Sequence, residues 1–513
     1  MRLRTSTTKT AAAACATACL TAAAFVAAPG SAAAEGTTTL TADPLATWQT
    51  NGIVWSLAYA RGVVYAGGSF TSVRPPGAAP GEKEKTRTNF AAFDAVTGKL
   101  LPCAPAFSGG ANTVRAMKPS RDGSVLYVGG SFGKVGSTGV ASAVALNTAD
   151  CSLRKDFRPA VSATVRAIDV TDKAVYLGGD FTTVSGQARS RIAALSPSGK
   201  LLPFNAEIDG PVRAITAAEK HGKVFVGGDF DWVQGNWAHA LVALDPSTGS
   251  TVQTYENWIP ARSVVKALAH DGTNFYLGAE GTGTWMFDGR IAGDLATGEL
   301  RWKDNCLGAT QAVVPYKGIL YSGSHAHDCS DTPGGFPEHK KRHHFVANSI
   351  ANKTIQYWFP DTNDGLGEQL GPRAMVMANG ILWTGGEFTT VNDKPQQGLT
   401  RFGDGPDIGA PDVPKLAVSS TSATVNELSW QASWDRDDAV LTYKIYRDGA
   451  LLKSLAQRSA YWDRPQMHFT DTVTANTRHR YSITVTDGDN TSPHSGRVTV
   501  SAALAQTGTA DKP

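Results

Sequence analysis

The chain repeats the stretch Tyr176-Leu177-Gly178-Gly179-Asp180-Phe181, and this repetition indicates its fold. Alternating apolar residues lead into each copy, as in a strand, and paired glycines at its end permit close approach of two backbones. Two copies, at Gly278-Ala279-Glu280 and Gly323-Ser324, have lost part of the pattern. The other full copies are Gly67-Gly68-Ser69-Phe70, Gly129-Gly130-Ser131-Phe132, Gly227-Gly228-Asp229-Phe230 and Gly385-Gly386-Glu387-Phe388.

The copies recur at intervals of 45 to 62 residues. Strand-rich repeats of about 40–50 residues are typical of β-propellers. We therefore predict an all-β protein whose residues 35–403 form a seven-bladed β-propeller with four strands per blade. The last repeat lacks its fourth strand after Phe402. We expect the segment Thr47 to Thr50 to supply it and close the ring, which protects the sheet edges.

The first 34 residues have the pattern of a secretory signal peptide. Basic Arg2, Arg4 and Lys9 precede an apolar run, and small residues end at Ala34. Loss of this segment takes the formal charge from +3 to zero, which gives no electrostatic reason to expect nucleic acid or an anionic membrane as partner. No other stretch is long and apolar enough to span a bilayer. We expect a secreted, extracellular monomer.

Four cysteines remain after cleavage: Cys103, Cys151, Cys306 and Cys329. An even number in an exported chain favours two disulfides, for which three pairings exist. We prefer Cys103–Cys151 and Cys306–Cys329, because each pair lies within one repeat or two neighbouring repeats.

A base near the start of a repeat is matched by an acid after its glycine pair. Two repeats have Trp55 or Gln311 in place of the base, and both have serine in place of the acid. Arg115 is the one base whose repeat has serine in place of the acid. A ring of bases that attracts an anion is one interpretation. The matched appearance of acids favours structural ion pairs within each repeat. The predicted pairs are Arg166–Asp180, Arg213–Asp229, Lys266–Glu280 and Arg373–Glu387.

The repeat resembles a known group. Val-Arg-Ala-Ile followed by Tyr-Leu-Gly-Gly-Asp-Phe-Thr-Thr-Val-Ser-Gly and Arg-Ile-Ala-Ala-Leu, from Val165 to Leu195, resembles the delta-60 repeat of secreted bacterial β-propellers. The resemblance covers about Thr47 to Gly403. It implies the fold and brings no settled activity with it.

A second domain follows a Gly/Pro-rich linker at 404–413. Residues 414–503 alternate as short strands, a β-sandwich pattern, and 504–513 form a tail that we expect to be disordered. Pro411 to Val500 is similar to a bacterial fibronectin type III domain. That similarity implies that Trp430 is the buried tryptophan of its second strand, and that Tyr481 or His479 is its tyrosine corner.

The sixth repeat carries a histidine-rich loop. Imidazoles beside a carboxylate suit zinc, nickel or copper. The candidate ligands are His325, His327, Asp328, His339, His343 and His344. The alternative is a solvated basic loop around Lys340-Lys341-Arg342 that binds no metal. We expect the loops 359–372 and 74–87 to lie beside it on one sector of the ring.

No sequence motif selects a catalytic site. The chain has no Gly-x-Ser-x-Gly elbow, Walker loop or His-Glu-x-x-His, and no acidic pair stands out as a glycosidase couple. We therefore predict a non-catalytic protein that binds an extracellular polysaccharide or a cell-surface component. The alternatives are a glycosidase or polysaccharide lyase, and an adhesion scaffold.

Overall fold

The computed structural model describes residues 39–501, and these form an all-β protein. The predicted signal peptide, 1–34, and the tail, 504–513, lie outside the described residues. The sole helical element in the described part is a single 3-10 turn, η1 (Glu219–His221). No helix among the described residues is long and apolar enough to cross a membrane.

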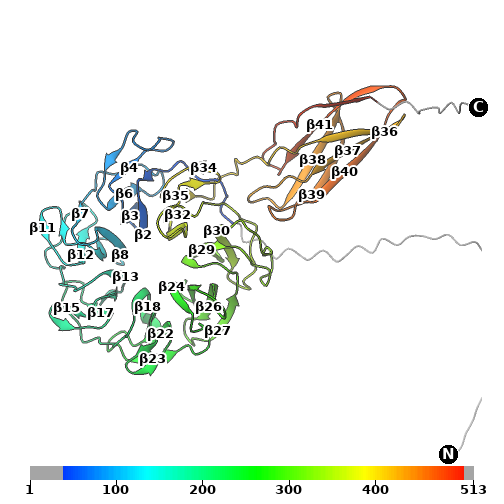
Figure 1. Ribbon diagram of the computed structural model, residues 1–513. Coiled ribbons are helices and arrows are strands. Elements are labelled where there is room, and N and C mark those ends of the chain that lie inside the picture. The colour runs from blue at the N-terminus through cyan, green and yellow to red at the C-terminus, as the bar shows by residue number, and fades with distance from the viewer. Residues whose placement is uncertain (1–38, 502–513) are drawn as a thin grey trace, which may run out of the picture. The chain divides into compact units, whose positions relative to one another are not determined.

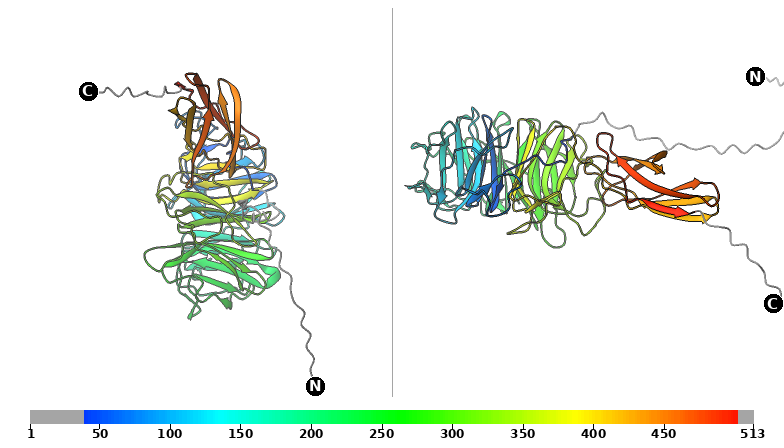
Figure 2. Two further views of the ribbon diagram at one scale, coloured as in Figure 1. Left: turned by 90° about the vertical axis from the view of Figure 1, so that its right-hand side faces the viewer. Right: turned by 90° about the horizontal axis from the view of Figure 1, so that it is seen from above.

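Most of the chain forms antiparallel sheets set around a propeller-like ring (Figure 1). Each begins with an inner strand, followed outward by strands in an up-and-down order. Figure 2 shows the strands of neighbouring sheets standing next to one another. The strands are β2 (Ile53–Ala60), β3 (Val63–Ser69) and β6 (Phe90–Asp94); β8 (Thr113–Pro119), β9 (Val125–Ser131) and β12 (Ala143–Asn147); β13 (Val165–Val170), β14 (Val175–Gly179) and β17 (Ile192–Leu195); β18 (Val212–Ala218), β19 (Lys223–Gly228), β22 (Leu241–Leu244) and β23 (Thr251–Thr254); β24 (Ser263–His270), β25 (Asn274–Gly281), β26 (Gly289–Asp294) and β27 (Leu300–Asp304); β28 (Thr310–Tyr316), β29 (Ile319–Ala326) and β30 (His343–Ser349); β31 (Pro372–Ala378), β32 (Ile381–Gly386) and β35 (Leu399–Phe402).

The expected fourth strand is complete in only two of these sheets, as β23 and β27. In other sheets only an isolated β-bridge stands in place of the fourth strand, such as Phe93 with Leu100 and Leu195 with Leu201. Pro102 and Pro203 follow these bridges within two residues. Proline lacks the N–H that a ladder needs, so pairing stops there.

Short strands of two or three residues extend several loops of the ring. They are β1 (Gln49–Thr50), β4 (Ser72–Arg74, three residues) and β5 (Lys85–Thr86); β7 (Phe107–Ser108), β10 (Lys134–Val135) and β11 (Thr138–Gly139); β15 (Thr183–Val184) with β16 (Gln187–Ala188); β20 (Trp232–Val233) with β21 (Asn236–Trp237); and β33 (Thr390–Val391) with β34 (Lys394–Pro395).

The glycine pairs set the spacing between and within the sheets. A Cβ on Gly178 would lie 2.4 Å from Cγ1 of Val212, on the inner strand of the next sheet. A Cβ on Gly179 would lie 2.1 Å from the carbonyl oxygen of Thr164, beside the inner strand of its own sheet. Gly67, Gly129, Gly227 and Gly385 meet valines in the same way. The repeated glycines therefore let each sheet approach its neighbour closely.

The ring closes between its first and last sheets. One buried cluster joins Val54 and Val64 of the first sheet to Trp383 and Leu399 of the last. The N-terminal segment runs along β35, with Pro44 bridged to Phe402 and the amide of Leu45 donating to the carbonyl of Arg401 at 2.8 Å. The pairing segment thus precedes the predicted Thr47 to Thr50, because β1 pairs with β4 instead.

Two further antiparallel sheets follow residue 416 and enclose a common apolar cluster. Trp430 and Tyr481 are both buried in it. The Tyr481 hydroxyl donates to Asp471 at 2.6 Å and accepts from Asn426 at 3.0 Å. One sheet contains β36 (Ala417–Ser422), β37 (Val425–Gln431) and β40 (Gln466–Thr472); the other contains β39 (Ala450–Arg458), β38 (Val440–Arg447), β41 (Arg478–Thr486) and β42 (Val498–Ser501).

Candidate functional site

The structure joins the four cysteines as preferred from the sequence. Cys103 is bonded to Cys151, and Cys306 to Cys329. The first bond links the turns after β6 and β12 in neighbouring sheets. The second fixes the base of the histidine-rich loop, where Cys306 and Cys329 are both buried.

Bases on the inner strands meet acids within ion-pair distance. Each base occupies the residue at which its inner strand shifts register, a β-bulge that re-aims one side chain. The N–O distances are 2.7 Å for Arg166–Asp180, 3.2 Å for Lys266–Glu280 and 2.8 Å for Arg373–Glu387, and Arg213 pairs with Asp229. Paired charges leave no free ring of bases.

Arg115 differs from the other bases, as its serine partner suggested. Its guanidinium lies over the Trp55 ring, 3.9 Å from the centroid. Burial lowers the pKa of Arg115 to about 10, and Arg166 nearby acts in the same direction. A cation–π contact therefore takes the place of the ion pair here.

The six predicted metal ligands do not form one ligand set. His327 Nδ1 meets Glu338 Oε2 at 2.8 Å, and His343 Nε2 meets His339 Nε2 at 3.1 Å. Asp328 accepts from the amide of Ser330 at 3.0 Å. Within residues 39–501, no three of the six bring ligand atoms within 4.8 Å of one another. The histidines of the long loop contact different partners. Their closeness in sequence therefore did not place them at one site.

His344 is buried and contacts two carboxylates. Its Nδ1 and Nε2 lie 3.0 Å from Asp361 Oδ1 and 3.0 Å from Asp364 Oδ1. Burial acts to lower the pKa of His344, but the two carboxylates outweigh it and raise that pKa to about 9. With both ring nitrogens engaged, this imidazolium has no lone pair to offer a metal.

Burial holds the pKa of two other histidines low, near 4 for His325 and near 3 for His343. His325 Nδ1 is buried and has no hydrogen-bond partner in the described structure. The ring of His343 packs 4.4 Å from that of Phe336. Both are neutral at physiological pH.

The loops of repeats six and seven lie side by side, as expected. Besides His344, Lys341 pairs with Asp361 at 3.2 Å, and Arg342 with Asp364 at 3.6 Å. The loop 74–87 has its own contacts: Arg74 is buried and donates to Gln49 and Gln397 at 2.8 and 3.0 Å. Its closeness to the other two loops stays a prediction.

The described carboxylates include one set with the spacing of a metal site, which the sequence did not single out. Ligand atoms of Asp407, Asp437 and Asp438 all lie within 4.8 Å of one another. Burial, and then the neighbouring Asp435, raise the pKa of Asp437 to about 8. Burial is the largest cause of the raised pKa at Asp407, Asp437 and Asp438, and nearby carboxylates act in the same direction.

Two exposed tryptophans pack edge to face on the hairpin formed by β20 and β21. Trp232 and Trp237 are cross-strand partners and are 48% and 46% exposed, although tryptophan is a largely buried residue type. Their ring centroids are 5.4 Å apart at an interplanar angle of 82°. The turn between them uses positive φ at Gln234 and Gly235, as a two-residue hairpin turn requires. We call these two residues the tryptophan pair.

A fixed histidine supports the tryptophan pair. The ring of His239 stacks on Trp237, with centroids 5.7 Å apart and planes 15° from parallel. His239 Nδ1 lies 2.6 Å from Asp231 Oδ1, and its Nε2 lies 3.0 Å from the carbonyl oxygens of Pro260 and Ser263. This network holds the imidazole, and through it the Trp237 ring, in one orientation.

Equivalent hairpins in other repeats show that the fold does not require these rings. The cross-strand positions hold Thr183 with Ala188, Thr390 with Pro395, and Lys134 with Gly139. The sequence carried a signal that repeat alignment would have found: Gly-Gly-Asp-Phe-Thr-Thr-Val-Ser-Gly from Gly178 becomes Gly-Gly-Asp-Phe-Asp-Trp-Val-Gln-Gly from Gly227. Trp285, 90% exposed, lies in the corresponding loop of the next repeat.

No protein-family model matches the sequence, and no curated protein matches it. Solved structures match it at low similarity. Sqt1 of Saccharomyces cerevisiae aligns with a TM-score of 0.41 at 10% identity, over 72% of this chain and 100% of that one. The exo-β-1,3-galactanase Pc1,3Gal43A of Phanerochaete chrysosporium aligns with 0.29 at 10% identity, over 77% and 99%. Likeness at this level carries no argument about function.

Proposed function

We propose that this is a secreted, non-catalytic protein that binds an extracellular polysaccharide through the tryptophan pair on the ring. We further propose that the ring is a seven-bladed β-propeller with delta-60-type repeats, and that the sandwich at 414–503 is a fibronectin type III domain. The tryptophan pair carries the functional proposal.

Exposed indole rings suit sugars because the faces of a pyranose present apolar C–H groups, which pack on a flat aromatic surface. Such rings bury a large area for little loss of side-chain freedom, and the indole N–H is left for a hydroxyl. The hairpin and His239 hold Trp237 in place before a ligand arrives, which lowers the entropic cost of binding. Propellers bind through loops supported by a rigid ring.

The carboxylates of the histidine-rich sector and of the inner strands support binding over hydrolysis. A glycosidase needs two carboxyl groups that face a shared substrate, one of them with a raised pKa. In the histidine-rich sector, Asp361 and Asp364 both contact His344, and the pKa of each is lowered. The acids at the inner strands are paired with bases.

Two disulfides and the signal-peptide pattern support an extracellular location, since oxidised cysteines persist outside the cytosol. The neutral formal charge of the chain after cleavage supports a partner other than nucleic acid.

The test compares the full chain with its Trp232→Ala, Trp237→Ala double variant on neutral polysaccharides by affinity electrophoresis. A matched control, Val252→Ala, removes an exposed apolar side chain from the same repeat, and Trp232→Phe keeps an aromatic ring. We expect the double variant to lose retardation on any glycan that retards the parent, while the two controls keep it. Equal retardation of parent and double variant, or release of reducing sugar from the bound glycan, would contradict the proposal.

A further inference from the structure

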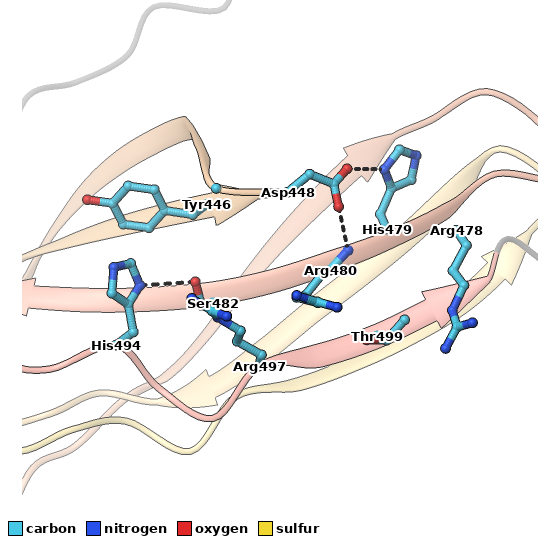
Figure 3. Close-up of a pocket in the computed structure, with 10 residues that line it drawn as sticks. Tyr446, Asp448, Arg478, His479, Arg480, Ser482, His494, Arg497 and Thr499 are labelled. Atoms are coloured by element: carbon cyan, nitrogen blue, oxygen red, sulfur yellow. Dashed lines mark hydrogen bonds and ion pairs between the residues drawn. The ribbon is translucent and has the colours of Figure 1, made fainter.

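We propose that the outer face of the second sandwich sheet holds a separate anion site, which binds the sulfate or carboxylate groups of an acidic polysaccharide. The site lies over β38, β41 and β42 and is shown in Figure 3. It is a cavity of about 700 Å³, and we call it the arginine cavity. Its main lining residues are Tyr446, Arg478, Arg480, Ser482, His494 and Arg497.

Strand alternation creates the arginine cavity. Along β41, Tyr481, Ile483 and Val485 are buried in the sandwich core. Arg478 and Arg480 alternate with these residues, so both side chains leave the opposite face, about 7 Å apart. Two exposed arginines two positions apart therefore point into the same space.

The neighbouring strands bring the remaining groups to that face. Thr499 of β42 is the cross-strand partner of Arg480, and Arg497 lies two residues earlier along the chain. On the other side, Tyr446 of β38 pairs with Ser482. His494 is joined to Ser482 Oγ through Nδ1 at 3.0 Å, and its ring centroid lies 4.9 Å from that of Tyr446 (Figure 3).

Positive charge exceeds negative charge in the arginine cavity, which is lined by three arginines and one acid. Among the described residues, no ion pair involves Arg478, Arg480 or Arg497. The one acid that lines the cavity is Asp448. It already accepts from the amide of Arg480 at 2.9 Å and faces His479 Nδ1 at 2.7 Å.

Arginine clusters of this kind match anions with several oxygens. A guanidinium donates two parallel N–H bonds to a carboxylate or sulfate, and a like-charged cluster is relieved when such an anion binds. The ring of Tyr446, which is tilted by 60° from the His494 ring, offers a face for the sugar that carries the anion. Nucleic acid is a poorer fit, because it requires a wide basic surface, whereas formal charge outside the signal peptide balances.

The experiment measures binding of heparin, a sulfated polysaccharide, and of polygalacturonate, a carboxylated one, to the full chain by calorimetry. The test variant is Arg480→Gln, Arg497→Gln. The control variant, Arg121→Gln, Arg158→Gln, removes the same charge from exposed positions on the ring. We expect the test variant to bind the two polymers at least tenfold more weakly than the parent does, and its affinity to fall less steeply with salt concentration. The control variant should have the affinity of the parent.

Three outcomes would overturn the inference: binding of neither polymer by the parent, equal affinities of the test and control variants, or displacement of heparin by duplex DNA at an equal concentration of charges. The inference does not depend on the tryptophan pair. We expect the Trp232→Ala, Trp237→Ala variant to bind heparin as the parent does, so each proposal can fail alone.

Discussion

The glycine pair is the residue-scale feature on which the ring depends. Gly178 lies where the inner strand of the next sheet packs, and an added methyl would approach Val212 Cγ1 to 2.4 Å and Ile215 Cδ1 to 2.9 Å. Both contacts are far inside van der Waals distance, and the surrounding side chains are buried.

We expect Gly178→Ala to lower the free energy of unfolding by about 1–3 kcal/mol, the usual cost of overpacking a core. Gly139→Ala is the matched control, because a Cβ there meets nothing within 4 Å. Its effect should stay within about 0.5 kcal/mol. The midpoints of urea unfolding of the parent and the two variants measure these changes in stability. Indistinguishable midpoints would show that the sheets can move apart at Gly178 without loss of stability.

The His344 contact makes stability depend on pH. Its pKa of about 9 in the folded state exceeds the ordinary value of about 6.5, so the contribution is complete below pH 6.5 and is lost as pH rises through 9. We expect His344→Gln to cost about 2–3 kcal/mol more at pH 6 than at pH 10. Chemical denaturation at both pH values, with His327→Gln as control, measures it. A cost that is the same at both pH values would contradict the ionic role.

At the scale of elements, the loops are tied to the ring in different ways. The bond between Cys103 and Cys151 links two turns 48 residues apart in sequence, and both cysteines are only half-buried. Cys306 and Cys329 are buried, so their removal would also disturb packing.

Replacing Cys103 and Cys151 together by serine should therefore report the cross-link itself. Loop-closure entropy for this separation predicts a loss of up to about 4 kcal/mol in the free energy of unfolding. Thermal unfolding of the oxidised parent and the double variant checks the value. Peptide mapping without reduction checks the pairing, and free thiols at these positions in the purified protein would refute it.

At the scale of the whole molecule, the two ends of the ring hold each other. The amide of Leu40 donates to the Tyr321 hydroxyl at 3.0 Å, across 281 residues, and the Leu40 side chain is buried among β29, β30, β32 and β35. The indole of Trp383 donates to the carbonyl of Ala95 at 3.1 Å across the closing sheets.

We expect Leu40→Ala to destabilise the ring by about 2–4 kcal/mol, because it leaves a cavity at the closure. Leu45→Ala is the control from the same segment: its amide bonds to β35, but its side chain is 37% exposed. Calorimetry should show a lower midpoint for the first variant alone. Equal midpoints would mean that the N-terminal segment does not hold the closure.

The repeated sheets, the close packing at the glycine pairs and the pairing of bases with acids could be predicted from the sequence. Each of these recurs from repeat to repeat. The base and acid of a pair lie 14 or 16 residues apart in sequence, at two adjacent strands of one sheet, and a β-bulge at the base re-aims its side chain. The preferred cysteine pairs also followed from position within the repeats. The outer strands were overestimated, since prolines such as Pro102 interrupt pairing that the repeat pattern alone implied.

Tertiary structure alone decided the candidate sites. Six potential ligands within 20 residues were dispersed, because a long loop sets its distances through contacts with other segments, as His344 does with Asp361 and Asp364. Trp232 and Trp237 became a pair only through the register of their hairpin. Arg497 joined Arg478 and Arg480 because β42 lies beside β41. Side-chain neighbours across strands depend on register and sheet order, which one sequence does not state.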